Sequence, residues 1–109
     1  MSDWKPISLI DLKKEIESGV KLMSQGQLEL WRKISIKPEK WIEEEFGKEV
    51  GGFWIVAISG NHLVWYNDIE EGFNISTYST YGKIEEYWTE QDELQLTINK
   101  LERHHNNGS

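Results

Sequence analysis

The fold is decided by residues 53–67, which read Phe53-Trp54-Ile55-Val56-Ala57-Ile58-Ser59-Gly60-Asn61-His62-Leu63-Val64-Trp65-Tyr66-Asn67. The unbroken apolar run of residues 53–58 predicts that residues 53–59 form a strand that is covered on both faces and is therefore central in a sheet. Gly60-Asn61 predicts a two-residue hairpin turn, because both residues tolerate the positive φ that such turns require. The chain should then return as an antiparallel strand over residues 62–67.

Two more strands are predicted after this hairpin. Residues 68–72 form a longer loop in which Gly72 takes a left-handed bulge position, and residues 73–79 form the third strand. Gly82 interrupts the chain before a short fourth strand at residues 84–88.

Two capping signatures predict a helical hairpin at the N-terminus. Ser8-x-x-Asp11 opens a first helix, which Gly19 should end, and Ser24-x-x-Gln27 opens a second. The second helix must end before Pro38, because proline breaks a helix interior. The segment that follows, around Trp41, predicts either an edge strand or a loose helical turn. Its run of carboxylates is expected to be a solvated face: Glu43, Glu44 and Glu45.

A third signature, Thr89-x-x-Asp92, predicts a C-terminal helix whose apolar residues Leu94, Ile98 and Leu101 face the sheet. The fold class is therefore α+β, with an N-terminal helical hairpin, an antiparallel meander of about four strands, and a C-terminal helix packed on the sheet. Residues 1–103 are expected to form one domain, and residues 104–109 a disordered polar tail.

Length and composition exclude several classes of protein. A chain of 109 residues is too short for two independent cores. There is no cysteine, which excludes disulfides and cysteine-bound zinc, and no apolar run approaches 18 residues. We expect a cytoplasmic protein that does not associate with membranes.

Charge is unevenly distributed along the chain. Residues 1–40 carry eight Lys or Arg and six Asp or Glu, a net charge of +2, whereas residues 41–109 carry four and thirteen, a net charge of −9. An acidic surface repels phosphate backbones, so we expect no nucleic-acid partner, and it accelerates encounter with a basic protein. The same acidity also suits a domain that only needs to remain soluble.

The candidate partner-binding face combines carboxylates and tyrosines around the predicted loops. Tyrosines are favoured over the six tryptophans, which a domain of this size needs for its core, because a phenol tolerates a partly hydrated site. The carboxylates are either contacts for a basic partner or solvated turn residues. The predicted face consists of Asp68, Glu70, Glu71, Glu85, Glu86, Tyr66, Tyr78 and Tyr81.

Catalytic, metal-binding and cofactor-binding motifs are not found. The sequence has no phosphate loop, nucleophile elbow or zinc-binding helix, and residues 68–72 lack the ligand spacing of a calcium loop. A histidine beside a turn, His62, is typical of a turn residue rather than a general base. We therefore predict no enzyme, no metal and no cofactor, although a carboxylate-dependent hydrolase stays a third alternative.

Within about residues 30–101, the chain resembles small acidic bacterial immunity proteins of polymorphic-toxin and contact-dependent inhibition systems. The segments that carry this resemblance are residues 52–58, 64–74, 82–84 and 91–94. The resemblance implies an inhibitor that neutralises a basic toxin domain, such as a nuclease, without cofactor or turnover. The alternative is a binding module for a protein or small ligand with a housekeeping role.

Overall fold

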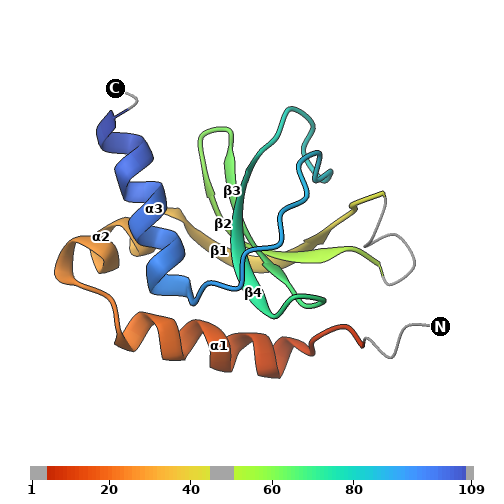
Figure 1. Cartoon of the computed structure of the whole chain (residues 1–109), viewed down its shortest axis with the longest axis horizontal. Coiled ribbons are helices and arrows are strands. Elements are labelled where there is room, and N and C mark those ends of the chain that lie inside the picture. The colour runs from red at the N-terminus through yellow and green to blue at the C-terminus, as the bar shows by residue number, and fades with distance from the viewer. Residues whose placement is uncertain (1–4, 45–50, 108–109) are drawn as a thin grey trace.

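The computed structural model describes residues 5–44 and 51–107, with side chains as far as Arg103. Within these residues, three helices and four strands form one α+β unit in which the helices lie on one side of the sheet (Figure 1). In chain order the elements are α1 (Leu9–Lys21), α2 (Gln25–Ile34), β1 (Ser35–Trp41), β2 (Phe53–Ser59), β3 (His62–Asn67), β4 (Gly72–Thr77) and α3 (Leu94–Asn107).

The sheet is an antiparallel meander in the order β1-β2-β3-β4, so the predicted central position of β2 is confirmed. The predicted hairpin is also confirmed: Ser59 pairs with His62, and Gly60 has a φ of 60°. Glycine at the first central position is typical of a type II′ turn, whose twist matches that of the flanking strands.

The fourth strand of the sheet is not the predicted one. Residues 84–88 form no strand, and the outer position beside β2 is taken by β1, which begins directly after α2. Pro38 lies within β1 and cannot donate a backbone hydrogen bond, which an edge strand tolerates. Residues 84–88 instead approach β4 through side chains, as in the hydrogen bond of 2.7 Å from Ser76 Oγ to the Glu86 carbonyl.

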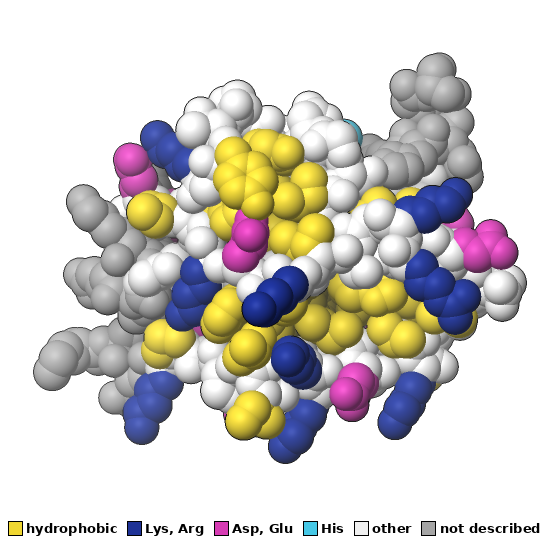
Figure 2. Space-filling view, turned by 180° about the vertical axis from the view of Figure 1, so that it is seen from behind, with side chains coloured by type: hydrophobic (Ala, Val, Ile, Leu, Met, Phe, Trp, Pro, Cys, Tyr) yellow, Lys and Arg dark blue, Asp and Glu magenta, His cyan; other side chains and the backbone are white. Residues whose placement is uncertain are grey.

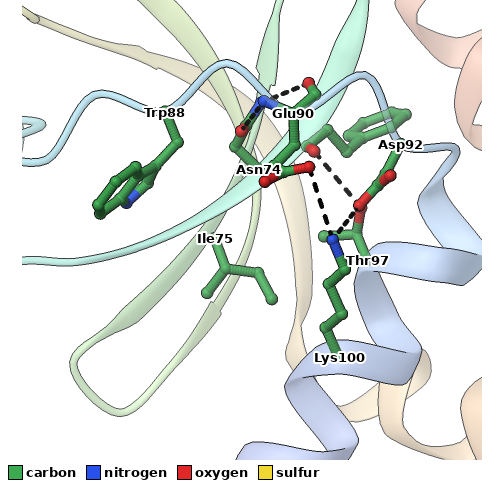
Figure 3. Close-up of a pocket in the computed structure, with 8 residues that line it drawn as sticks. Asn74, Ile75, Trp88, Glu90, Asp92, Thr97 and Lys100 are labelled. Carbon is green, nitrogen blue, oxygen red and sulfur yellow. Dashed lines mark hydrogen bonds and ion pairs between the residues drawn. The ribbon is translucent and has the colours of Figure 1, made fainter.

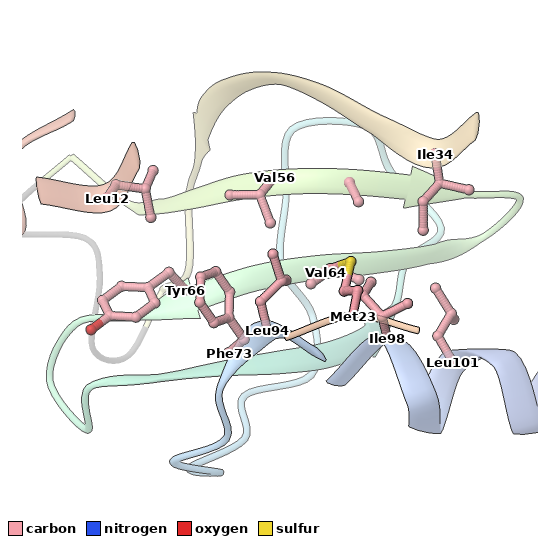
Figure 4. Close-up of a cluster of buried hydrophobic side chains, with 11 residues drawn as sticks. Leu12, Met23, Ile34, Val56, Val64, Tyr66, Phe73, Leu94, Ile98 and Leu101 are labelled. Carbon is pink, nitrogen blue, oxygen red and sulfur yellow. The ribbon is translucent and has the colours of Figure 1, made fainter. Parts of the chain in front are cut away.

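One hydrophobic core lies between the sheet and the helices (Figure 4). The predicted α3 residues Leu94, Ile98 and Leu101 are fully buried there, which confirms that this helix packs on the sheet. Gly19 does not end α1, which continues to Lys21. A Cβ at Gly19 would lie 2.5 Å from Cβ of Leu94, so this glycine allows α1 and α3 to approach closely.

A second core lies on the opposite face of the sheet, on which none of the described helices packs. It contains Trp41, Phe53, Ile55, Leu63, Trp65 and Ile84. The chain after β4 covers this face and also pairs with the end of β1, since the Ile84 N–H donates to the Ile42 carbonyl at 2.8 Å. Tyr78 packs against Trp41 with ring centroids 5.1 Å apart, so this segment closes the sheet over its second core.

The caps and acidic runs differ in part from the predictions. The predicted capping box of Ser24 and Gln27 is present, but Thr89 does not cap α3, whose first turn instead donates to the Glu93 carbonyl. Glu43 is buried rather than solvated, and Glu45 lies outside the described residues. Helix α3 includes residues 104–107 of the predicted tail.

None of the described helices has the length and apolar character needed to cross a membrane.

Candidate functional site

The predicted site residues lie near both ends of β4 rather than on one continuous face. Tyr66, Asp68, Glu70 and Glu71 belong to the end of β3 and the β3–β4 turn, whereas the other predicted residues follow the opposite end of β4. A six-residue strand rises roughly 17 Å between its first and last Cα atoms. The structure therefore separates the predicted face into two groups.

The group after β4 is engaged within the protein. Glu86 Oε1 accepts hydrogen bonds from Thr77 N at 2.5 Å and Thr77 Oγ1 at 2.7 Å. The carboxylate of Glu85 accepts hydrogen bonds from the backbone and hydroxyl of Ser79. These two carboxylates stabilise the loop that follows β4, so a partner would have to compete with internal donors for them.

Tyr78 and Tyr81 of the same group surround Trp41. The Tyr78 hydroxyl donates to the Gly60 carbonyl at 3.1 Å. The Tyr81 ring is 65% exposed, and its hydroxyl donates to Glu39, which also accepts from the Trp41 indole at 2.8 Å. The hydrogen bonds from Tyr81 and then Trp41 lower the pKa of Glu39, and the bond to Glu39 raises the pKa of Tyr81.

The β3–β4 turn is held by its own polar side chains. Asn67 Oδ1 accepts from the backbone N–H groups of Ile69 and Glu70 at 3.0 and 3.2 Å, the arrangement of an Asx turn. Asp68 is buried, and its Oδ2 accepts from the Ile7 N–H at 2.8 Å. The turn is thereby fixed against the segment that leads into α1, so Asp68 positions this segment rather than presenting its carboxylate to solvent.

A groove runs between this turn and α1, which lies along the bottom of Figure 1. Two adjoining hollows of about 480 and 310 Å³ make up the groove, and both are lined by Tyr66, Glu71 and Asp11. We call this feature the acidic groove. Its charged lining consists of the carboxylates of Asp11, Glu15, Asp68 and Glu71 and the ammonium groups of Lys5 and Lys14, a net charge of −2.

Asp11 and Glu15 are missing from the face predicted from sequence. Their i, i+4 spacing on α1 places both on one side of that helix, which is a readable signal. What the sequence does not reveal is that this side faces the β3–β4 turn, some 55 residues later in the chain.

Tyr66 forms the inner wall of the acidic groove. Its ring packs against Phe73 in the helix-side core, with centroids 4.9 Å apart, and its hydroxyl points away from that core (Figure 4). Burial, followed by the charges of Glu15, Glu71 and Asp68, raises the pKa of Tyr66 to about 12. The hydroxyl is therefore protonated at neutral pH and can both donate and accept a hydrogen bond.

Glu71 has a left-handed backbone conformation, with a φ of 59°, and no other described non-glycine residue has a positive φ. The prediction that Gly72 takes the left-handed position is therefore wrong by one residue. Gly72 is required for a different reason, because a Cβ there would lie 2.3 Å from the Cα of Gln91. A glutamate in the left-handed region costs roughly 1–2 kcal/mol relative to glycine.

Basic side chains gather on another part of the surface. Figure 2, seen from behind relative to Figure 1, shows Lys and Arg side chains around a band of hydrophobic surface. Among the described residues, no group of three or more histidines and carboxylates is arranged to hold a metal ion.

Comparisons with protein-family models, with curated proteins and with solved structures find no match to this chain.

Proposed function

We propose that this protein is a non-catalytic binding protein that captures a basic protein through the acidic groove. The resemblance to immunity proteins is the reason to suggest a toxin domain, such as a nuclease, as that partner. Capture of the toxin domain would neutralise it by covering its basic active site.

The observation that supports this proposal most is the conformation of Glu71. The left-handed backbone at this position favours glycine, and yet the residue is a glutamate whose side chain lines both hollows of the groove. Residues held in unfavourable backbone conformations cluster at functional sites. Tyr66 adds a neutral hydroxyl beside this carboxylate, so the groove offers both an ionic and a neutral contact for a basic side chain.

The groove suits the tip of a basic loop better than a small organic anion. Its carboxylates outnumber its ammonium groups four to two, so arginine or lysine side chains enter favourably and anions do not. Carboxylates at the margin of such an interface contribute mainly to association rate and salt dependence. Tight binding would also need apolar contact around the groove, within a standard interface of about 800 Å² per partner.

The test compares the proteins captured by immobilised wild-type protein and by a groove variant from a lysate of the native host. The groove variant combines Asp11→Asn, Glu15→Gln and Glu71→Gln, which removes three negative charges without changing the size of the side chains. We expect the wild type to capture a basic protein, identified by mass spectrometry, that the groove variant retains at least about tenfold less.

A matched control removes the same number of charges elsewhere on the surface. It combines Glu17→Gln, Glu29→Gln and Glu44→Gln, all at exposed positions outside the groove lining. The control variant should capture the basic protein like the wild type. Equal loss in both variants would show that net charge alone attracts the partner, and equal capture by all three proteins would exclude the groove as the binding site.

A further inference from the structure

Another hollow, separate from the acidic groove, lies between β4, α3 and residues 86–92 (Figure 3). Its volume is about 190 Å³, close to the roughly 150 Å³ of a protein cavity that holds one benzene ring. It is therefore the size of one large side chain rather than of a typical small-molecule ligand. We call it the side-chain pocket, and it is lined by Phe73, Asn74, Ile75, Trp88, Glu90, Asp92, Thr97 and Lys100.

The pocket is rigidly supported, because residues 86–92 run antiparallel to β4 and are fixed to it. Asn74 is buried; its Oδ1 accepts from Glu90 N at 2.8 Å and its Nδ2 donates to the Glu90 carbonyl at 3.2 Å. The Phe73 N–H donates to the Asp92 carbonyl at 2.9 Å. Alternate residues of an extended segment point to the same side, which explains why Trp88, Glu90 and Asp92 all line the pocket.

The charges in the pocket leave one carboxylate weakly engaged. The ammonium group of Lys100 donates a hydrogen bond to Asp92, and this bond raises the pKa of Lys100. Glu90 lies 3.8 Å from the same ammonium group, and its side chain is 62% exposed. Two carboxylates and one ammonium group give a net charge of −1, so the pocket attracts a cation and Glu90 is the group available to pair with it.

The indole of Trp88 provides the aromatic wall of the pocket. This residue is 51% exposed, and in Figure 3 its ring lies across the pocket from Lys100, with Ile75 between them. Tryptophan is the aromatic residue that attracts cations most strongly. An arginine fits such a site better than a lysine, because its planar guanidinium stacks on a ring and donates two hydrogen bonds to one carboxylate.

We propose that the side-chain pocket receives one arginine side chain of a basic protein, with the guanidinium stacked on Trp88 and hydrogen-bonded to Glu90. This inference rests on the proposed function for the identity of the partner, but the pocket itself can be tested without that partner. An arginine in a pocket of this kind is the sort of anchor that dominates the energy of a protein interface.

The test is a titration of the full chain with N-acetyl-arginine methylamide, followed through the indole N–H resonances in ¹⁵N-labelled protein. The Trp88 resonance is assigned with the variant Trp88→Phe. We expect a saturable shift of the Trp88 resonance at millimolar ligand. The uncharged isostere N-acetyl-citrulline methylamide and the anion N-acetyl-glutamate methylamide should give no saturable shift, and a response to either as large as that to arginine would overturn the proposal.

Two single variants separate the pocket from general attraction to an acidic protein. Glu90→Gln should weaken arginine binding at least about threefold, whereas Glu93→Gln, an exposed carboxylate nearby that does not line the pocket, should leave it unchanged. Equal weakening by both variants would refute a specific site. If the pocket binds arginine while the groove variant still captures the basic protein, the acidic groove is refuted as the binding site and the side-chain pocket is supported. If the pocket does not bind arginine while the groove variant loses capture, only the proposal for the side-chain pocket is refuted.

Discussion

Replacing Glu71 by glycine should stabilise the fold and weaken partner binding at the same time. The φ of 59° costs a glutamate roughly 1–2 kcal/mol, which glycine avoids. Glycine in turn loses more backbone entropy on folding, which costs about 0.5–1 kcal/mol. The difference is a net gain of about 0.5–1 kcal/mol in the free energy of unfolding.

Urea denaturation followed by tryptophan fluorescence measures this gain. With a slope of about 2 kcal/mol per molar urea, the midpoint should rise by about 0.3–0.5 M. The matched control is Glu70→Gly, which removes the same charge from the neighbouring residue, whose φ is not positive. The control should lower the midpoint, because it adds the entropy cost without relieving strain.

The same two variants test the link between strain and binding. Glu71→Gly should weaken capture of the basic protein severalfold, because the variant loses a carboxylate that lines both hollows of the acidic groove. If Glu71→Gly lowers the urea midpoint as much as Glu70→Gly does, the backbone at residue 71 is not strained. If it raises the midpoint but leaves capture unchanged, Glu71 has no role in binding.

Three further predictions concern stability. Gly72→Ala should lower the free energy of unfolding by at least about 2 kcal/mol, because its Cβ would meet backbone atoms at 2.3 Å. The control Gly26→Ala should be neutral or stabilising, because its Cβ meets only a flexible carboxylate at 3.2 Å, and similar urea midpoints for the two variants would contradict this. Ser76→Ala should cost about 1–3 kcal/mol, because it leaves the buried Trp65 indole N–H without its acceptor at 2.9 Å; a loss in the urea midpoint worth less than about 0.5 kcal/mol would argue against that role. Because the pKa of Tyr66 is raised to about 12 from 10.0, its share of stability is complete below pH 10 and is lost as pH rises through 12, a decrease of roughly 2 kcal/mol once solvent screening in the groove is included. Over this range the free energy of unfolding of Tyr66→Phe, measured by denaturation, should fall less than that of the wild type, and parallel curves would refute the assignment.

Local signals in the sequence predict much of the fold. The Gly60-Asn61 hairpin, the capping box of Ser24 and Gln27, and the apolar face of α3 each depend on residues within one turn or one helix. Such patterns are complete in the sequence, because the interacting residues are only a few positions apart. The α+β class follows from their order along the chain.

The edge strand depends on tertiary contacts, and the sequence predicts it only as one of two alternatives around Trp41, without its start at Ser35. Residues 35–41 contain Pro38 and alternate poorly, and β1 forms because β2 offers an edge with which it can pair. Residues 84–88 have the apolar and aromatic pattern of a strand. However, the Ser76 hydroxyl donates to the Glu86 carbonyl, so a side-chain hydrogen bond stands where a strand would form backbone hydrogen bonds with β4. Propensity alone does not distinguish these two segments.

The candidate site is predictable only in part for the same reason. Tyr66 and Glu71 belong to the predicted face and line the acidic groove, but the sequence does not show that Asp68 and Glu86 accept internal hydrogen bonds from Ile7 and Thr77. Whether a carboxylate faces a partner or an internal donor is decided by residues that are distant in sequence and close in space.

Binding of the basic partner in the acidic groove can be measured by calorimetric titration of the purified partner into the wild type, the groove variant and the control variant. The dissociation constant of the groove variant should be at least about tenfold larger than that of the wild type, and the difference should shrink as salt is added. The control variant, which loses the same three charges at Glu17, Glu29 and Glu44, should stay within about threefold of the wild type. Equal dissociation constants for the two variants would show that the acidic groove is not where the partner binds.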